Sequence, residues 1–155
     1  MGNAKFNLPL PPNDPIRSYA PGSPERKAIK AKLAEMKSKQ IEIPLIIGGK
    51  EVKTGNMGKC VLPHDHRTVI GTYHKAGEKE VRMAVEAALE ARKTWAAMNW
   101  YDRVSIFLRV AELLAGPWRY TMNAATMLAQ SKNVFQAEID AVSYTHLTLP
   151  TIYSV

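Results

Sequence analysis

The chain has 155 residues, of which 46% are hydrophobic and 23% are charged, a composition typical of a folded globular domain. Its apolar runs are far shorter than the roughly 20 residues that span a bilayer, so we do not expect a membrane protein. The formal net charge of +7 lies mostly on one lysine-rich segment without interleaved aromatic residues, which favours a solvated helix face over a nucleic-acid interface.

The N-terminal part is rich in proline and then changes to a helix pattern. Residues 1–22 contain too many prolines for a helix or a central strand, so we predict an extended arm there. The arm shows neither a secretory signal nor the arginine-rich pattern of a mitochondrial transit peptide. Ser23 supplies a helix cap, Pro24 suits the first helical position, and Glu25 lies near the positive end of the helix dipole. These residues predict a helix from Ser23 to about Gln40.

Short apolar runs separated by turns follow from Ile41, and this texture predicts strands. Gly48 and Gly49 lie between two such runs, where a two-residue hairpin needs positive φ angles. We therefore expect two hairpins, or a small antiparallel meander.

The most regular pattern in the chain, from Val81 to Leu114, predicts two amphipathic helices joined at a turn that bears tryptophan. Each helix is expected to bury one face. The second helix ends at Gly116-Pro117, because proline disfavours helical geometry in the residue before it. Aromatic residues at the helix ends are expected to pack together as core rather than to form a ligand cage, and these are Trp95, Trp100, Tyr101 and Trp118.

A third helix is predicted from Trp118 to Gln130, and residues 131–133 interrupt the pattern. A fresh helix should begin near Val134. Beyond Ala141 the sequence has β-branched and aromatic residues without helical spacing, so we predict that no helix continues there. Residues 142–155 are interpreted as a non-native tail.

Three candidates for catalytic chemistry are better explained by structure. Cys60, the single cysteine, excludes an intramolecular disulfide and suits a reducing compartment. It lies in a strand-like run without a paired base, so we predict a small buried hydrophobic residue rather than a nucleophile. Glu138 and Asp140 point to different helix faces, which favours surface or interhelical salt bridges over an acid and base pair. We assign no catalytic residue.

Metal and nucleotide sites are not indicated either. His64, Asp65 and His66 point in alternating directions and suit a turn, with His74 the one other histidine nearby, so we predict no metal site. The glycines at residues 48–49 lack the spacing of a phosphate-binding loop, and no GxGxxG stands between a strand and a helix. We therefore assign no metal ligand and no cofactor-binding residue.

Three stretches carry a family resemblance: PGSPER at residues 21–26, VRMAVEAALEARKTW at residues 81–95, and QAEIDA at residues 136–141. Their order resembles the N-terminal region of the aldehyde dehydrogenase superfamily, and most of all its pyrroline-5-carboxylate dehydrogenase branch. The resemblance implies an α/β parent fold, of which this chain is an α+β segment with short antiparallel strands followed by amphipathic helices. It implies that residues 23–141 belong to the cofactor domain.

The same resemblance implies a function for the parent enzyme. It is expected to use NAD to oxidise a small-molecule aldehyde, L-glutamate γ-semialdehyde, to glutamate in proline degradation. The implied location is the mitochondrial matrix, and the implied assembly is a homo-oligomer with no membrane or nucleic-acid partner. The nucleophile, its general base and the NAD-binding strands of the family match no residues here, so we expect the 155-residue chain to be inactive by itself.

Two alternatives remain open from the residues. One is a stand-alone basic helical module that binds a partner through its lysine-rich helix, with cooperative folding and salt-sensitive binding. The other is a different subfamily of aldehyde dehydrogenases. The enzyme-segment interpretation differs from the binding module in predicting large exposed apolar faces, because helices built to pack on a missing sheet lie open.

Overall fold

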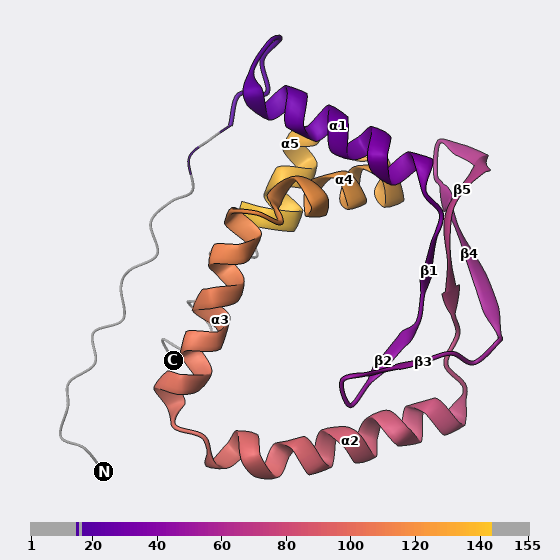
Figure 1. Cartoon of the computed structure of the whole chain (residues 1–155), viewed down its shortest axis with the longest axis vertical. Coiled ribbons are helices and arrows are strands. Elements are labelled where there is room, and N and C mark those ends of the chain that lie inside the picture. Colours follow the sequence, from indigo (N-terminus) through magenta and orange to yellow (C-terminus); the bar gives the residue numbers. More distant parts are fainter. Residues whose placement is uncertain (1–14, 16, 144–155) are drawn as a thin grey trace.

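The computed structural model describes residue 15 and residues 17–143. Its elements trace an open frame, in which α1 and α4 lie along one side, the strands along the next, α2 along the base and α3 along the fourth (Figure 1). The elements in chain order are α1 (Pro24–Ser38), β1 (Ile41–Ile43), β2 (Leu45–Ile47), β3 (Lys50–Val52), β4 (Met57–Leu62), β5 (Asp65–His74), α2 (Glu78–Ala97), α3 (Trp100–Ala115), α4 (Arg119–Gln130), α5 (Val134–Ala137) and a π-helical turn, η1 (Glu138–Ser143).

Helix α1 begins where its sequence predicts. The Ser23 side chain accepts a hydrogen bond from the Arg26 backbone N–H at 3.2 Å, and Pro24 occupies the first turn. Ile29 is buried against Ala124 of α4, and this contact is the centre of a small core. Partly buried side chains surround it, namely Leu33, Met36, Tyr120, Met127 and Val134.

The hairpin predictions are confirmed for two strand pairs. Strands β2 and β3 pair antiparallel across Gly48 and Gly49, whose φ angles are 57° and 76°. Strands β4 and β5 also pair antiparallel, and they turn between Leu62 and Asp65. Pro63 and His64 form this turn, as expected for His64, whereas Asp65 and His66 already belong to β5.

The prediction of an entirely antiparallel arrangement is wrong for β1, which pairs parallel with β5 in a sheet of order β1-β5-β4. Pro44 explains the difference, because it has no backbone N–H and divides the apolar run into β1 and β2. The two pieces then belong to different sheets. Gly71 permits the parallel pairing, since a Cβ at this position would lie 2.8 Å from the Ile41 carbonyl oxygen.

Helices α2 and α3 confirm the predicted helix pair, but the α2 face is not buried. No residue of α2 is buried, and Val81, Val85 and Leu89 are 54%, 53% and 56% exposed. Within the described residues, most of the apolar stripe that the sequence assigns to a core is uncovered, although Trp95 near its end packs on Phe107 of α3. The enzyme-segment interpretation predicts an open apolar face of this kind.

The C-terminal elements extend two residues beyond the predicted helix end. Ser131 ends α4 with a φ of 53°, and Asn133 caps α5, as the predicted interruption requires. The chain then widens into the π-helical turn, which places Val142 in a fully buried position. Burial of this side chain outweighs its poor helix propensity, so the predicted end at Ala141 is wrong.

Two sequence predictions lie largely outside the described residues. The extended arm of residues 1–22 is described only at residue 15 and residues 17–22, which form no helix or strand. The predicted tail of residues 142–155 is described only at its first two positions. Among the described helices, none is both long enough and apolar enough to cross a membrane.

Candidate functional site

A buried carboxylate that accepts four hydrogen bonds is the centre of a polar cluster between η1, α4 and the segment before α1. The Glu138 Oε1 atom accepts hydrogen bonds from Nε of Arg119, at 2.7 Å, and from Nη2 of the same guanidinium. The Glu138 Oε2 atom accepts from the Tyr19 hydroxyl at 2.6 Å and from the Asn123 side-chain amide. All four residues are buried, and we call them the Glu138 cluster.

Local structure explains how distant residues meet in the Glu138 cluster. Arg119 and Asn123 lie one turn apart on α4 and therefore share a face. The left-handed Ser131 and the Asn133 cap turn the chain back, so that η1 returns along α4 and brings Glu138 to this face. Tyr19 arrives from the opposite end of the sequence, 119 residues away.

The electrostatics of the cluster fix the protonation of its members. Burial, followed by the hydrogen bond to Glu138, raises the pKa of Tyr19 above its ordinary value, so its hydroxyl remains a proton donor. The Arg119 guanidinium forms a buried salt bridge with Glu138. Because each carboxylate oxygen already accepts two hydrogen bonds, Glu138 is suited to a structural role rather than to general-base catalysis.

The sequence predicts surface or interhelical salt bridges for the two acidic residues of QAEIDA, and the structure confirms an interhelical one for Glu138. Glu138 bridges to Arg119 of α4, whereas Asp140 forms a separate ion pair with Lys132. The sequence analysis did not identify the other members of the cluster. The available signal was the four-residue spacing of two polar residues, Arg119 and Asn123, on one face of α4.

His74 forms a second buried polar site at the end of β5. Its Nδ1 atom accepts hydrogen bonds from the backbone N–H groups of Thr54 and Gly55, at 3.1 and 3.2 Å. Its Nε2 atom lies 2.8 Å from a carboxylate oxygen of Glu42. The hydrogen bond from His74, and then that from Lys53, lowers the pKa of Glu42. Since Nδ1 is an acceptor, the proton must lie on Nε2, and the ring joins β1, β5 and the β3–β4 loop.

The histidines therefore have different partners. His64 is bonded to the Ser131 hydroxyl at 2.6 Å, while His74 is bonded to Glu42. A group of three or more His, Cys, Asp or Glu side chains arranged to hold a metal ion does not occur among the described residues. The structure thus assigns structural contacts to two of the histidines from which a metal site could have been built.

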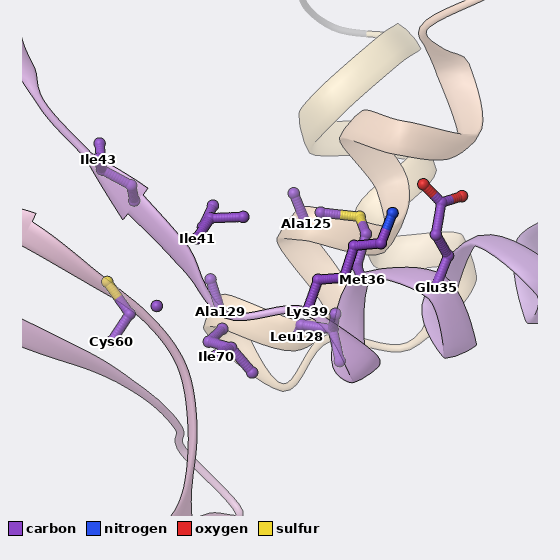
Figure 2. A pocket seen from close by; sticks show the side chains of 11 residues that line it. Glu35, Met36, Lys39, Ile41, Ile43, Cys60, Ile70, Ala125, Leu128 and Ala129 are labelled. Carbon is purple, nitrogen blue, oxygen red and sulfur yellow. The ribbon is translucent and has the colours of Figure 1, made fainter.

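Cys60 lies in the wall of an apolar cavity of about 260 Å³ between α1, α4 and the three-stranded sheet (Figure 2). Most of the wall is aliphatic, and the charged residues are Glu35 and Lys39 at the end of α1. Cys60 is partly rather than fully buried, so the prediction of a buried hydrophobic residue holds only in part. Glu35 is the one carboxylate among the described lining residues; it lies on the far side of the cavity from Cys60 and is bonded to Lys32 (Figure 2).

The start of α2 provides a test of nucleotide binding, because a glycine stands there between a strand and a helix. The Gly77 N–H donates to its own helix, to the Glu80 carboxylate at 2.8 Å. Glu78 adds a second negative charge in the same turn. An incoming diphosphate would be repelled by these carboxylates, so the residues at this position do not fit NAD.

The three tryptophans at the helix ends are exposed, contrary to prediction, and Tyr101 is half-buried. Trp95 and Trp118 are 37% and 53% exposed. The expected packing of aromatic rings on one another is seen between Trp100 and Tyr101, whose centroids lie 6.1 Å apart in an edge-to-face arrangement. Trp95 also packs on a neighbour, because its ring lies edge-to-face on Phe107 of α3 with the centroids 6.2 Å apart.

Comparison with known proteins gives a consistent result. The sequence profile of the aldehyde dehydrogenase family matches residues 51–149. The chain is 48% identical to a delta-1-pyrroline-5-carboxylate dehydrogenase of Agaricus bisporus, over 90% of this chain and 26% of the relative. It is 39% identical to the mitochondrial enzyme of that name from Homo sapiens, over 84% of this chain and 23% of the relative.

The solved structures agree with the sequence relatives. The fold is similar to that of the Mycobacterium tuberculosis delta-pyrroline-5-carboxylate dehydrogenase bound with NAD, with a TM-score of 0.93 and 42% identity. This similarity covers 97% of the present chain and 28% of the other. The chain thus spans about a quarter of the length of the curated relatives that it matches.

Proposed function

The chain belongs to the aldehyde dehydrogenase family, and from this premise we propose that it forms the N-terminal part of a pyrroline-5-carboxylate dehydrogenase. The proposed enzyme oxidises L-glutamate γ-semialdehyde, the open form of pyrroline-5-carboxylate, to glutamate in proline degradation. One observation carries the proposal: a TM-score of 0.93 and 42% identity to an enzyme of that name over 97% of this chain.

Within that enzyme, the chain has an architectural role. Residues 23–141 supply the leading strands and outer helices of the cofactor domain, and residues 1–22 form the arm that precedes it. Two observations support this role: both oxygens of the buried Glu138 carboxylate are occupied by structural hydrogen bonds, and the apolar face of α2 is open for packing. NAD and the aldehyde would be bound by residues of the parent that this chain does not contain.

The cellular setting follows the same relatives. Several of them, including those of Dictyostelium discoideum and Homo sapiens, are mitochondrial enzymes. On this basis we propose that the parent enzyme is mitochondrial. The matrix location and a homo-oligomeric assembly are proposed from the family resemblance alone. Residues 142–155 are assigned to a tail that does not belong to the native cofactor domain.

A chimera tests the proposed function. Residues 17–143 would replace the matched segment of the Mycobacterium tuberculosis enzyme, and NADH formation would be followed with pyrroline-5-carboxylate and with aliphatic aldehydes of similar length. We expect the activity of the chimera with pyrroline-5-carboxylate to lie within about tenfold of that of the unaltered Mycobacterium tuberculosis enzyme, because both segments share one fold. The 155-residue chain alone, assayed in parallel, should form no NADH.

Two results would contradict the proposal. A folded, NAD-binding chimera that prefers the aliphatic aldehydes would assign the chain to another subfamily. Turnover by the isolated chain would show that its own residues carry the chemistry.

A further inference from the structure

The segment that precedes α1 is attached to the core through one side chain. Tyr19 is only 4% exposed, whereas its neighbours Ser18 and Ala20 are exposed. The next buried side chain along the sequence is Ile29, in the second turn of α1. We call residues 17–22 the strap.

The Tyr19 side chain lies in a site with the chemistry of a phenol receptor. Ile29 and Ala124 form apolar walls, and Phe135 presents its ring at 90° with a centroid distance of 6.1 Å. At the far end, the Tyr19 hydroxyl donates to Glu138 at 2.6 Å and accepts from the Asn123 amide at 3.3 Å. The site therefore meets both the apolar ring and the polar tip of a phenol.

The polar groups of this receptor have partners other than Tyr19. Glu138 keeps two hydrogen bonds from the Arg119 guanidinium and one from Asn123. Arg119 also donates to the Ala115 carbonyl at 3.1 Å. The fully buried Asn123 has a side-chain oxygen with no hydrogen-bond partner, which leaves acceptor capacity in the site. Loss of the tyrosine would thus leave a formed cavity and a carboxylate that is still paired.

The backbone of the strap does not favour its own position. Tyr19 has a φ of 49°, in the left-handed region that a non-glycine residue adopts at a cost in free energy. The contacts of its side chain must offset this strain. Other polar ties of the strap in the described residues are a hydrogen bond from the Arg26 guanidinium to the Tyr19 carbonyl at 3.3 Å, one from the Ser23 N–H to the Ala20 carbonyl at 3.0 Å, and an Arg17–Glu25 ion pair at 3.9 Å.

From these observations we propose that Glu138, Arg119 and Asn123, together with the apolar walls formed by Ile29, Ala124 and Phe135, make a phenol-binding site whose ligand is Tyr19 of the same chain. Docking of this one side chain holds the strap, and its withdrawal releases residues 17–22 as a unit. The occupant is the chain's own tyrosine because the structure places it there with both polar contacts made.

Cavity rescue tests the proposal. Tyr19→Gly removes the side chain at a position where glycine adopts the positive φ without strain. We expect trypsin to cut the Arg17–Ser18 bond at least about tenfold faster in this variant than in the wild type. Millimolar p-cresol, which is the tyrosine side chain as a free molecule, should raise the melting temperature of Tyr19→Gly. Toluene should raise it less, and neither compound should affect the wild type, whose site is filled.

Two further variants keep the test decisive. Tyr19→Phe retains the ring and loses the hydroxyl, so it should be cut at Arg17–Ser18 at an intermediate rate even if Tyr19→Gly fails to fold. Tyr73→Phe removes a hydroxyl from a tyrosine that is 38% exposed on β5 and should be cut like the wild type.

Three outcomes would overturn the proposal. Unchanged cleavage of both Tyr19 variants would show that the strap is held by other contacts. Equal effects of p-cresol and toluene would exclude phenol recognition. A wild-type dimer that dissociates on Tyr19→Phe substitution would assign the site to the tyrosine of a second copy.

Discussion

At the scale of single residues, His74 has partners on both ring nitrogens. Nδ1 accepts hydrogen bonds from two backbone N–H groups of the β3–β4 loop, and Nε2 faces Glu42 of β1. This one side chain of β5 is thus bonded to two other segments of the chain. Asparagine can place an acceptor near the Nδ1 position, whereas glutamine can reach toward the Nε2 partner. The two contacts are thus separable by substitution.

We expect His74→Phe to lower the free energy of unfolding by about 2 kcal/mol or more, because it leaves the Thr54 and Gly55 N–H groups without an acceptor. His74→Asn should recover more of this loss than His74→Gln, since it restores the acceptor for two donors. Urea denaturation of the β-sheet, followed by circular dichroism, measures the difference. If the glutamine variant were the more stable one, the contact with Glu42 would be the dominant one.

Residue-scale contacts were the least predictable part of the molecule. Ser23 as a cap and the turn at His64 follow from local chemistry and were predicted correctly. The hydrogen bond between Tyr19 and Glu138 joins residues 119 positions apart, and no periodicity records such a pair. Cys60 was assigned to a core, but its environment depends on how α1 and the sheet meet around the cavity.

At the scale of secondary-structure elements, the sequence predicted the helices more fully than the sheet. Helix ends depend on caps, glycine and proline within a few residues, so they can be located from local sequence. The parallel pairing of β1 with β5 depends on strands about 30 residues apart, and only the close approach at Gly71 permits it. The faces of helices were predicted as apolar stripes, but their burial depends on a neighbour that must also be present.

The open face of α2 leads to a prediction. Val85→Gln combined with Leu89→Gln should change the free energy of unfolding of this chain by less than about 0.5 kcal/mol, because both side chains are exposed. The same double substitution should reduce the fluorescence of a dye that binds apolar surfaces. In the chimeric enzyme we expect the double substitution to lower the free energy of unfolding by several kcal/mol, because the remainder of the enzyme would cover this face.

Leu62→Ala provides the matched control, since Leu62 is fully buried in β4. It should destabilise the isolated chain by about 2–5 kcal/mol. A large loss of stability from the α2 double variant in the isolated chain would contradict the exposed position of that face.

At the scale of the whole molecule, the described residues form a frame of unequal parts rather than one core. The contacts among α1, α4, α5 and the N-terminal strap surround one small apolar cluster. In contrast, α2 packs lightly, near the turn where a Cβ on Gly48 would lie 3.5 Å from Ala87 (Figure 1). Because α2 buries no residue, its unfolding exposes little additional apolar surface and need not be coupled to the rest.

This arrangement predicts two levels of hydrogen-exchange protection in the isolated chain. Amides of α4 and of the β4–β5 pair should be protected at least about 100-fold more strongly than amides of α2, which can open without disrupting the core. In the chimeric enzyme the protection of α2 should rise toward that of α4, because the remainder of the enzyme would cover its apolar face. Hydrogen exchange followed by mass spectrometry resolves the elements separately. Equal protection throughout the isolated chain would instead favour a stand-alone cooperative module, the alternative that the lysine-rich α1 left open.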